Sequence, residues 1–518
     1  MRSPSEASTG ARAPGLRRLL TPSLLDCLLV SLLAWQFAVG GRWVTLLADG
    51  DTGWHIRTGE YVLDHGRWPH EDLFSFSKPG QPWYAWEWLA DVIFALLFRL
   101  AGLAGVAAGA GLLIIVAAWA VFARMMRRRA DPLLAMIVLM LAVGASAIHF
   151  LARPHIFTLL FWAVALAWIE QDREQPSARV WRLVPLAALW ANMHGGFTAL
   201  LASLGLIAAG RAAEAWLDGS RGAARWRPAL RYAALTAACG AASLANPYGW
   251  RLHLHIAAYL RSDWIRNVVD EFQSPKFRSE HSLHFELLAA AALMLVPAML
   301  KQKRIGEALL TLFWAHAALV SARHIPLFAI LVAPAVAGEA SRLWRDWALG
   351  RPAHSVAAIL ERVGRDLAPG FARASPWAAA GLAAVILATP AAHWPRDFPA
   401  RKFPVEIVGR RGPALAGARI FTSDQWADYL IYRFYPEQRV YFDGRSDFYG
   451  PGIGQQYLKT VQGRPGWGRT LERWDFRFVL APVDWPLAGL LEERPEWRRL
   501  ERDQVAVLYE RAGQGAPR

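Results

Sequence analysis

Long apolar runs separated by short polar segments occupy most of the chain. A helix needs about 20 mostly apolar residues to cross the hydrocarbon core of a bilayer, and several of these runs reach that length. We therefore expect an α-helical polytopic membrane protein with about eleven transmembrane helices. The expected spans are 24–47, 103–123, 133–150, 156–170, 183–195, 197–216, 229–245, 284–300, 305–321, 325–341 and 376–393.

The positions of arginine and lysine predict the orientation of these spans. Arg12, Arg17 and Arg18 precede the first span, so we place the N-terminus in the cytoplasm. Every second loop is then rich in Arg or Lys, as expected of cytoplasmic loops, while the loops at 48–102 and 246–283 lie on the outer side. The cytoplasmic loops are those that hold Arg124–Arg129, Arg173–Arg182, Arg221–Arg231, Lys301–Arg304 and Arg342–Arg373.

Two segments are expected on the outer side in addition to the loops. The run Trp86–Leu100 is apolar but short and contains Arg99, so we interpret it as an interfacial helix anchored by tryptophans. After residue 393 long apolar runs cease and Asp, Tyr, Pro and Gly become frequent, which predicts a small extracytoplasmic α/β domain at 394–518. The expected strands there are Arg419–Thr422, Arg439–Phe442, Phe476–Ala481 and Val505–Glu510, and the expected helices are Trp426–Phe434, Gly452–Gln462 and Trp485–Arg494.

Composition agrees with a membrane protein and excludes other classes. The chain is 54% hydrophobic and 19% charged, whereas soluble domains carry about 25% charged residues. The formal charge of +15 does not indicate nucleic-acid binding, because the arginines lie in short loops and form no basic stripe with interleaved aromatics. Cys27 and Cys239 both lie inside apolar runs, so we expect no disulfide framework.

These observations predict the domain organisation and the cellular location of the protein. A cytoplasmic tail at 1–23 precedes the transmembrane domain at 24–393, and the α/β domain follows it. The first span lacks a cleavage pattern and is interpreted as a retained signal anchor. We expect a multi-pass protein of the bacterial inner membrane, with the N-terminus cytoplasmic and the C-terminal domain extracytoplasmic.

Unusual polar residues collect in the outer turns, where polar groups near membrane depth are costly and therefore candidates for function. Inner loops contribute mainly arginine. The candidates are Asp49, Asp51, His55 and Arg57 after the first span, then Arg153, His155, Asn192, His194, Glu271, Arg323 and His324, with Asp443 and Arg445 in the C-terminal domain.

Each candidate also has a purely structural interpretation. Asp49 fits a capped turn, and Arg153 and Arg323 fit side chains that extend to the membrane interface. Asn192 and His194 fit hydrogen bonds between helices. The turn at Asp443–Arg445 fits a local ion pair after a strand. The convergence of carboxylates, cations and imidazoles on one side of the membrane favours a shared site.

The residue types suggest chemistry on a phosphate. Asp49 and Asp51, separated by one residue and with a third carboxylate nearby, suit a hard divalent cation such as Mg²⁺ or Mn²⁺. Arginine and histidine around such a site suit a phosphate group. A protein with this site at its outer surface would meet phosphate chiefly on lipid carriers, which predicts a polyprenyl-phosphate-linked substrate whose leaving phosphate is stabilised there.

The first outer loop carries a family resemblance. Its segment Asp51–Arg57 resembles the loop of the oligosaccharyltransferase catalytic subunit, which shows an Asp, aromatics and a following Arg before a Pro-x-x-Asp. That subunit belongs to the GT-C superfamily of membrane glycosyltransferases, and the layout of spans and outer domain is also similar. Bacterial GT-C-like membrane proteins are more similar, through Trp190–Gly196 and Phe442–Arg445. Further matches are Gly59, Glu60, Asp64–Gly66, Pro69–Asp72, Val268–Glu271, Arg323 with Pro326, and Gln425–Tyr429.

The resemblance implies roles for several of the candidates. Asp51 would be the principal metal ligand and the carboxylate that orients the acceptor, assisted by Asp49 and Glu271, and Arg323 would contact phosphate or acceptor. The family's second acidic pair is absent and Arg153 and His155 stand in its place, so this pair of cationic side chains would hold diphosphate directly. The Trp-Trp-Asp-Tyr-Gly motif of the family is degraded, which does not support recognition of an Asn-x-Ser/Thr acceptor.

We therefore expect a GT-C glycosyltransferase that moves a sugar from a polyprenyl-phosphate-linked donor to a glycan, lipid or protein acceptor on the outer face. Two alternatives stay open: a metal-independent polymerase or ligase of surface polysaccharide, and a non-catalytic scaffold or lipid-carrier-binding protein. The expected substrate- and phosphate-binding residues are His55, Arg57, Arg153, His155, Asn192, His194, Arg323 and His324, with Asp443 and Arg445 on the acceptor side.

Overall fold

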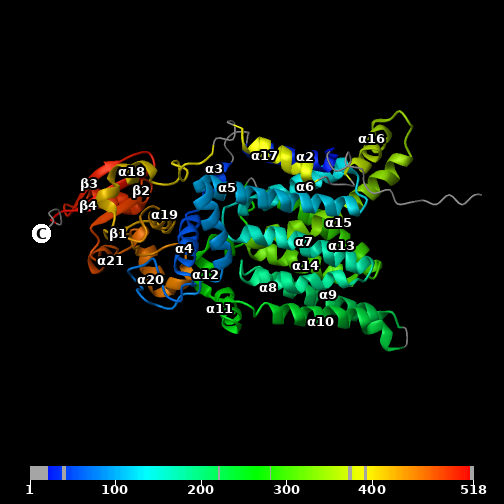
Figure 1. The fold of residues 1–518 in the computed structure, drawn as a ribbon, viewed down its shortest axis with the longest axis horizontal. Coiled ribbons are helices and arrows are strands. Elements are labelled where there is room, and N and C mark those ends of the chain that lie inside the picture. The colour runs from blue at the N-terminus through cyan, green and yellow to red at the C-terminus, as the bar shows by residue number, and fades with distance from the viewer. Residues whose placement is uncertain are drawn as a thin grey trace, which may run out of the picture.

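The computed structural model describes residues 21–37, 43–219, 222–279, 282–371, 376–389 and 394–513. Helices run side by side along the longest axis of the molecule, and a smaller domain with a β-sheet lies at one end of this bundle (Figure 1). This confirms the predicted fold class. The helices before the small domain are α2 (Leu24–Phe37), α3 (Trp43–Leu46), α4 (Asp51–His65), α5 (Trp88–Arg127), α6 (Pro132–Ser146), α7 (His155–Glu174), α8 (Leu183–Ala191), α9 (Phe197–Leu217), α10 (Arg227–Ala242), α11 (Trp250–Arg261), α12 (Asp263–Val268), α13 (Ser282–Lys301), α14 (Ile305–Val320), α15 (Ile325–Leu349), α16 (Val356–Phe371) and α17 (Pro376–Leu387).

Several of these helices can cross a membrane. Among the described residues, five helical segments are long and apolar enough to do so: Trp88–Arg127, Pro132–His149, Phe197–Leu217, Ser282–Lys301 and Ala322–Leu349. Two shorter apolar helices, α2 and α14, accompany them. Large apolar side chains on these helices point outward, which is the arrangement expected where a helix faces lipid. The protein is thus a multi-pass membrane protein, while the number of eleven spans and their orientation stay predictions.

The second expected span and the interfacial run before it form a single element, α5. The helix is broken at Ala101 and Gly102, and Gly102 has φ 61° and ψ −152°, a conformation that side chains with a Cβ rarely adopt. The break lies where the sequence separates the run Trp86–Leu100 from the span at 103–123. In the first expected span, residues 38–42 lie outside the described residues, as do 390–393 at the end of the last one.

The C-terminal domain contains a four-stranded sheet in the order β1-β2-β4-β3. β1 (Ile420–Phe421) pairs in parallel with β2 (Phe478–Pro482), and β4 (Ala506–Arg511) runs antiparallel to β2 and to β3 (Trp497–Arg502). Three expected strands are confirmed, β3 was not predicted, and Arg439–Phe442 is no strand of this sheet. The helices of the domain are α18 (Val405–Leu415), α19 (Asp424–Phe434), α20 (Ser446–Val461), α21 (Gly468–Arg473) and α22 (Pro486–Glu492).

The segment predicted as the fourth strand pairs instead with the first outer loop. Val440 forms a parallel β-bridge with Ser75, and its N–H and C=O bond to the backbone of Phe74 and Phe76 at 2.9 and 3.0 Å. The N–H of Gly50 donates to the Gln425 side chain of α19 at 2.7 Å. The outer loop and the C-terminal domain, which lie far apart in sequence, therefore form one packed unit next to the bundle.

Candidate functional site

A cavity of about 380 Å³ lies where the helix bundle meets the C-terminal domain. Its walls come from many separate segments of the chain, which the sequence analysis assigned to different outer turns. The polar lining includes Asp51 of α4, Glu87 just before α5, Arg153 and His155 at the start of α7, His194 between α8 and α9, Glu271, Arg323, His324, Gly444 and Arg445.

Asp51 begins α4, and the positive end of a helix dipole favours a carboxylate there. The backbone N–H of Asp51 donates to Asp49 Oδ1 at 3.0 Å, so the Asp-Gly-Asp segment folds as an Asx turn. One arginine links both carboxylates: Arg153 lies 2.8 Å from Asp51 Oδ2 and 3.1 Å from Asp49 Oδ2. Asp49 does not line the cavity itself and acts as a neighbour of Arg153.

The C-terminal domain closes tightly over Asp51. A Cβ at Gly444 would lie 1.9 Å from Asp51 Oδ1, so only glycine permits this approach. Asp51 Oδ1 is buried and has no hydrogen-bond partner among the described residues, and the same holds for Asp428 Oδ2 next to it. Burial raises the pKa of Asp51, against the opposing effect of Arg153, and burial likewise raises the pKa of Asp428. The carboxylate of Asp51 is therefore held in a place that favours its neutral form.

Glu87 is a second buried carboxylate of the cavity, and two histidines lie near it. Its oxygens lie 3.8 Å from His55 Nε2 and 3.6 Å from His194 Nε2. His55 is in turn fixed by Asp91 of α5, whose Oδ1 lies 2.6 Å from His55 Nδ1. Burial raises the pKa of Glu87 to about 8, and burial with the charge of Arg153 lowers the pKa of His55. Near neutral pH Glu87 can therefore both accept and release a proton.

The hydrogen bonds around His194 determine which of its nitrogens carries the proton. Trp190 Nε1 donates to Thr158 Oγ1 at 2.8 Å, which leaves the hydroxyl proton of Thr158 for His194 Nδ1, also at 2.8 Å. The N–H of Gly196 points at the same Nδ1 at 3.1 Å. Because Nδ1 accepts both bonds, the proton is on Nε2, the nitrogen that faces Glu87.

A second arginine lies in the cavity at the turn before α15. Arg323, in the 3₁₀ helix Ala322–His324, has Nη1 3.7 Å from Glu271 Oε1 and its guanidinium 4.2 Å from the ring centre of Phe272. Arg323 Nη1 has no hydrogen-bond partner among the described residues. Burial would raise the pKa of Glu271, but Arg323 and Arg153 outweigh it and hold that pKa below its ordinary value. Glu271 is thus an ionised partner for the two arginines.

Two further predicted histidines complete the lining near the ends of the spans. His155 Nε2 lies 2.7 Å from the carbonyl oxygen of His149, which lines the cavity as well. His324 Nδ1 lies 3.2 Å from the carbonyl oxygen of Ala317. Each of these rings has one nitrogen engaged with the backbone, so each has one nitrogen left for the cavity.

Besides Asp49, four predicted residues do not line the cavity. Arg57 donates from Nε to the carbonyl oxygen of Tyr432 at 2.9 Å and so joins α4 to α19. Asn192 accepts from Trp88 Nε1 at 2.9 Å and donates to two backbone carbonyls, which fits the structural interpretation. His55 and Asp443 act through Glu87 and Arg445, respectively.

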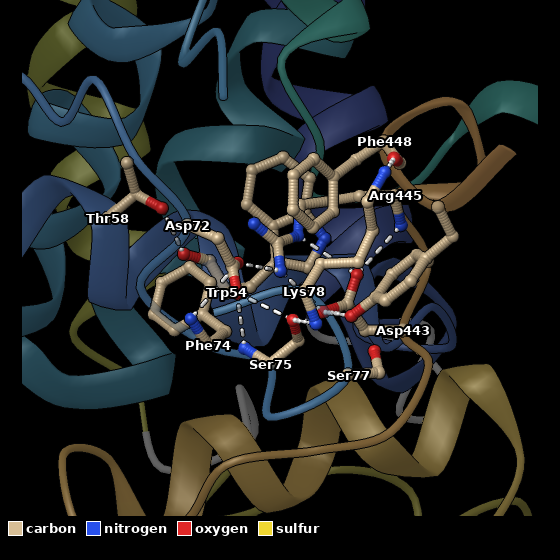
Figure 2. A network of polar contacts seen from close by, with 12 residues as sticks. Trp54, Thr58, Asp72, Phe74, Ser75, Ser77, Lys78, Asp443, Arg445 and Phe448 are labelled. Atoms are coloured by element: carbon tan, nitrogen blue, oxygen red, sulfur yellow. Dashed lines mark hydrogen bonds and ion pairs between the residues drawn. The ribbon is translucent and has the colours of Figure 1, made fainter. Parts of the chain in front are cut away.

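Arg445 joins the C-terminal domain to the outer loop. Its guanidinium lies between Asp443 and Asp72, with Nη2 2.7 Å from Asp443 Oδ2 and 2.8 Å from Asp72 Oδ1, as Figure 2 shows. The ring of Trp83 lies against the guanidinium, 4.6 Å from its central carbon. Tyr449 donates its hydroxyl to Asp443 at 2.7 Å. The local ion pair expected at Asp443–Arg445 is thus present, and it extends to a third residue across the domain boundary.

The surroundings of Asp49, Asp51 and Glu271 do not fit the predicted metal site. Arg153 is the partner of both aspartates and Arg323 faces Glu271, so a divalent cation at these oxygens would be repelled by a guanidinium. In the described part of the chain, no three His, Cys, Asp or Glu side chains are grouped to hold a metal ion. The arrangement fits an anion, such as phosphate, that replaces the carboxylates on the arginines.

Sequence reasoning missed Glu87, Asp91 and His149. A signal was present, since Glu87 and Asp91 are four residues apart at the start of an apolar run, where carboxylates are costly without a function. The run was interpreted through its tryptophans instead. Aromatic residues do line the cavity, among them Trp83 and Trp86.

Comparisons with known proteins show the fold. No model of a protein family matches the chain, and no curated protein matches its sequence. Similar solved structures include an archaeal oligosaccharyltransferase, AglB from Archaeoglobus fulgidus, in complex with an inhibitory peptide and a dolichol-phosphate. Its TM-score is 0.51 at 11% identity, with 95% of this chain and 74% of that chain covered. ArnT from Cupriavidus metallidurans bound to undecaprenyl phosphate gives a TM-score of 0.50 at 13% identity, covering 96% and 99%. The chain thus has the fold of GT-C membrane glycosyltransferases, as the resemblance of its first outer loop predicted.

Proposed function

We propose that this protein transfers a sugar from a polyprenyl-phosphate-linked donor to an acceptor on the extracytoplasmic face of the membrane. The observation that supports this most is a cavity at the end of the spans whose lining includes Arg153 and Arg323 together with the buried carboxylates of Asp51 and Glu87. Two solved structures of the same fold contain dolichol-phosphate and undecaprenyl phosphate. The acceptor class stays open between a glycan, a lipid and a protein.

Arg153 and Arg323 would bind the donor phosphate. Their side chains are only 25% and 20% exposed, and each guanidinium already lies next to a carboxylate. A phosphate offers several charged oxygens to these donors, and charge-assisted bonds of this kind are about twice as strong as neutral ones. Binding would exchange the present carboxylate partners for phosphate oxygens.

This exchange would also activate Asp51. In the structure Arg153 stabilises the ionised form of Asp51, against the effect of burial. The pKa of Asp51 is raised to about 7, so Asp51 is partly ionised near neutral pH, and only this ionised form can accept a proton. When the phosphate engages Arg153, the Asp51 carboxylate loses part of that stabilisation and becomes a stronger base. It then accepts the proton of the acceptor hydroxyl as the hydroxyl oxygen attacks the anomeric carbon. The bond between that carbon and the phosphate oxygen breaks, and polyprenyl phosphate leaves with the electron pair, next to the two arginines.

Arg153 between Asp49 and Asp51 favours the metal-independent form of this chemistry, in which arginines take the place of a divalent cation. That form predicts transfer in the presence of EDTA and loss of transfer in Arg153→Ala. If EDTA abolishes transfer and added Mg²⁺ or Mn²⁺ restores transfer, the reaction requires a divalent cation and the metal-independent form is wrong.

The first test is binding of undecaprenyl phosphate to the purified chain, followed by thermal unfolding. We expect the lipid to raise the melting temperature of the wild type. In Arg153→Ala and in Arg323→Ala the affinity for the lipid should be about 10-fold to 100-fold lower, since a hydrogen bond to a charged group contributes about 1.5–3 kcal/mol. Asp51→Asn, which removes a carboxylate that competes for Arg153, should bind at least as tightly as the wild type and lose transfer from lipid-linked sugars in proteoliposomes. Absence of stabilisation at saturating lipid contradicts the proposal, and binding without transfer of any sugar supports the scaffold.

A further inference from the structure

The helix α16 presents an apolar stripe that no other described part of the chain covers. Val356, Ile359, Leu360 and Val363 are between 39% and 73% exposed. Their spacing of three and four residues places them on one face of the helix. Isolated exposed apolar residues are ordinary, but a continuous stripe on a well-formed helix indicates a partner surface.

The orientation of this stripe is fixed by packing on the other side of α16. Gly364 is buried against Asp131, the residue that caps α6, and a Cβ there would lie 1.8 Å from the Asp131 carboxylate. At the C-terminal end of the helix, the ring of Phe371 lies 5.3 Å from that of Phe122 in α5. The helix is therefore attached to the bundle, and the stripe points away from it. Figure 1 shows α16 at the end of the bundle away from the C-terminal domain, and thus away from the cavity.

The surroundings of α16 have the composition of a membrane interface. Trp344 and Trp347 lie just before it, with ring centres 5.3 Å apart, and Arg351 lies 4.7 Å from the ring centre of Trp347. Tryptophan and arginine concentrate at the level of the lipid headgroups. Between residues 342 and 366 the sequence contains five arginines and three acidic residues, so the segment carries a net positive charge.

We propose that α16 lies in the plane of the membrane interface at the end of the bundle opposite the cavity. Its apolar stripe inserts among the acyl chains, and the arginines on its polar face, Arg362 and Arg365, contact the phosphates of anionic phospholipids. The helices packed against α16 also expose apolar residues: Leu24 of α2 and Leu133 of α6 are 37% and 36% exposed. Apolar exposure shared with helices of the bundle favours lipid over a protein partner. The proposal does not depend on the proposed transfer reaction.

The test compares the two faces of α16 in the full chain. Nitroxide labels are attached to Ile359→Cys and, on the polar face, to Arg365→Cys, in a background of Cys27→Ser and Cys239→Ala. The chain is reconstituted into vesicles of phosphatidylcholine and phosphatidylglycerol in equal parts. We expect a severalfold higher ratio of oxygen to nickel-chelate collisions at position 359 than at 365. Equal nickel accessibility at both positions would place the stripe in water, and inaccessibility of 359 to both reagents would show protein cover, such as a second copy. Either result overturns the proposal.

A second measurement addresses the headgroups. The melting temperature is compared between vesicles with phosphatidylglycerol and vesicles of phosphatidylcholine alone. We expect the anionic lipid to stabilise the wild type, and the double variant Arg362→Gln, Arg365→Gln to lose most of that difference. Arg498→Gln, at an exposed arginine of the C-terminal domain, should retain it and serves as the matched control. An undiminished lipid effect in the double variant would overturn the assignment of headgroup contact.

Discussion

Replacement of Arg445 by alanine should weaken the junction between the outer loop and the C-terminal domain. The arginine is 4% exposed, and its two acidic partners, Asp72 and Asp443, are buried as well. Removal of one member of a buried ion pair leaves a charge without compensation and costs about 3–5 kcal/mol. The same change also removes the contact of the guanidinium with the ring of Trp83.

The remaining hydrogen bonds place the expected cost near the lower limit. Asp72 keeps the N–H and hydroxyl of Ser75, at 2.8 and 2.6 Å, and Asp443 keeps the hydroxyl of Tyr449. We therefore expect a loss of about 3 kcal/mol in Arg445→Ala. For a unit the size of the C-terminal domain, this corresponds to a decrease of roughly 10 °C in the melting temperature.

Thermal unfolding of the purified chain in detergent, followed by tryptophan fluorescence, measures this loss. The matched control is Arg498→Ala, since Arg498 pairs with Glu510 at 3.1 Å but its side chain is 72% exposed. An exposed pair contributes about 0–1 kcal/mol, so the control should melt close to the wild type. If Arg445→Ala and Arg498→Ala melt at the same temperature, the junction does not depend on the buried ion pair and the reasoning is refuted.

Three further changes test other parts of the site. Because burial raises the pKa of Glu87 from 4.5 to about 8, the folded chain binds a proton that the unfolded chain has released, and stability is lost as the pH rises through that window. The melting temperature of Glu87→Gln relative to the wild type should therefore rise from pH 5 to pH 8, and an unchanged difference would argue against the raised pKa. Gly444→Ala should lower the melting temperature by an overpacking cost of about 1–3 kcal/mol, whereas Gly468→Ala, whose Cβ meets nothing within 4 Å, should not; equal melting would exclude the close approach to Asp51. Asn192→Ala should cost about 1–3 kcal/mol of stability, because the N–H of Trp88 loses its acceptor, yet leave binding of undecaprenyl phosphate unchanged; weaker binding would restore Asn192 to the site.

The meeting of several candidate residues in one cavity could be predicted from sequence. Apolar runs identify the spans, and loops on the same side of a bundle lie close together. Arg153, His194 and Arg323 each follow or precede such a run. To predict that they lie close together, it was enough to know on which side of the membrane each turn lies. The resemblance of the Asp51 loop to a known family independently predicted a site at the same end of the bundle.

Contacts between segments far apart in the chain could not be predicted in this way. A spacing of two residues between Asp49 and Asp51 suggests a metal site, but no local pattern shows that the guanidinium of Arg153 lies next to both. Val440 pairs with the outer loop and not with the C-terminal sheet. The extended segment around Val440 could pair with either, and the tertiary structure decides which one it contacts. Glu87 was missed because neighbouring tryptophans offered a sufficient explanation for its segment.

The close approach of Gly444 to Asp51 has a consequence for biosynthesis. These two residues are nearly four hundred positions apart, and they form adjoining parts of one wall. A ribosome that makes the chain from its N-terminus releases Asp51 early, together with Arg57 and Asp72, which find their partners Tyr432 and Arg445 only when the last segment has emerged. Until then the carboxylates and the arginine stay in contact with water. The cavity is therefore assembled at the end of synthesis, and a chain that stops before the C-terminal domain would contain most of the site residues but no finished site.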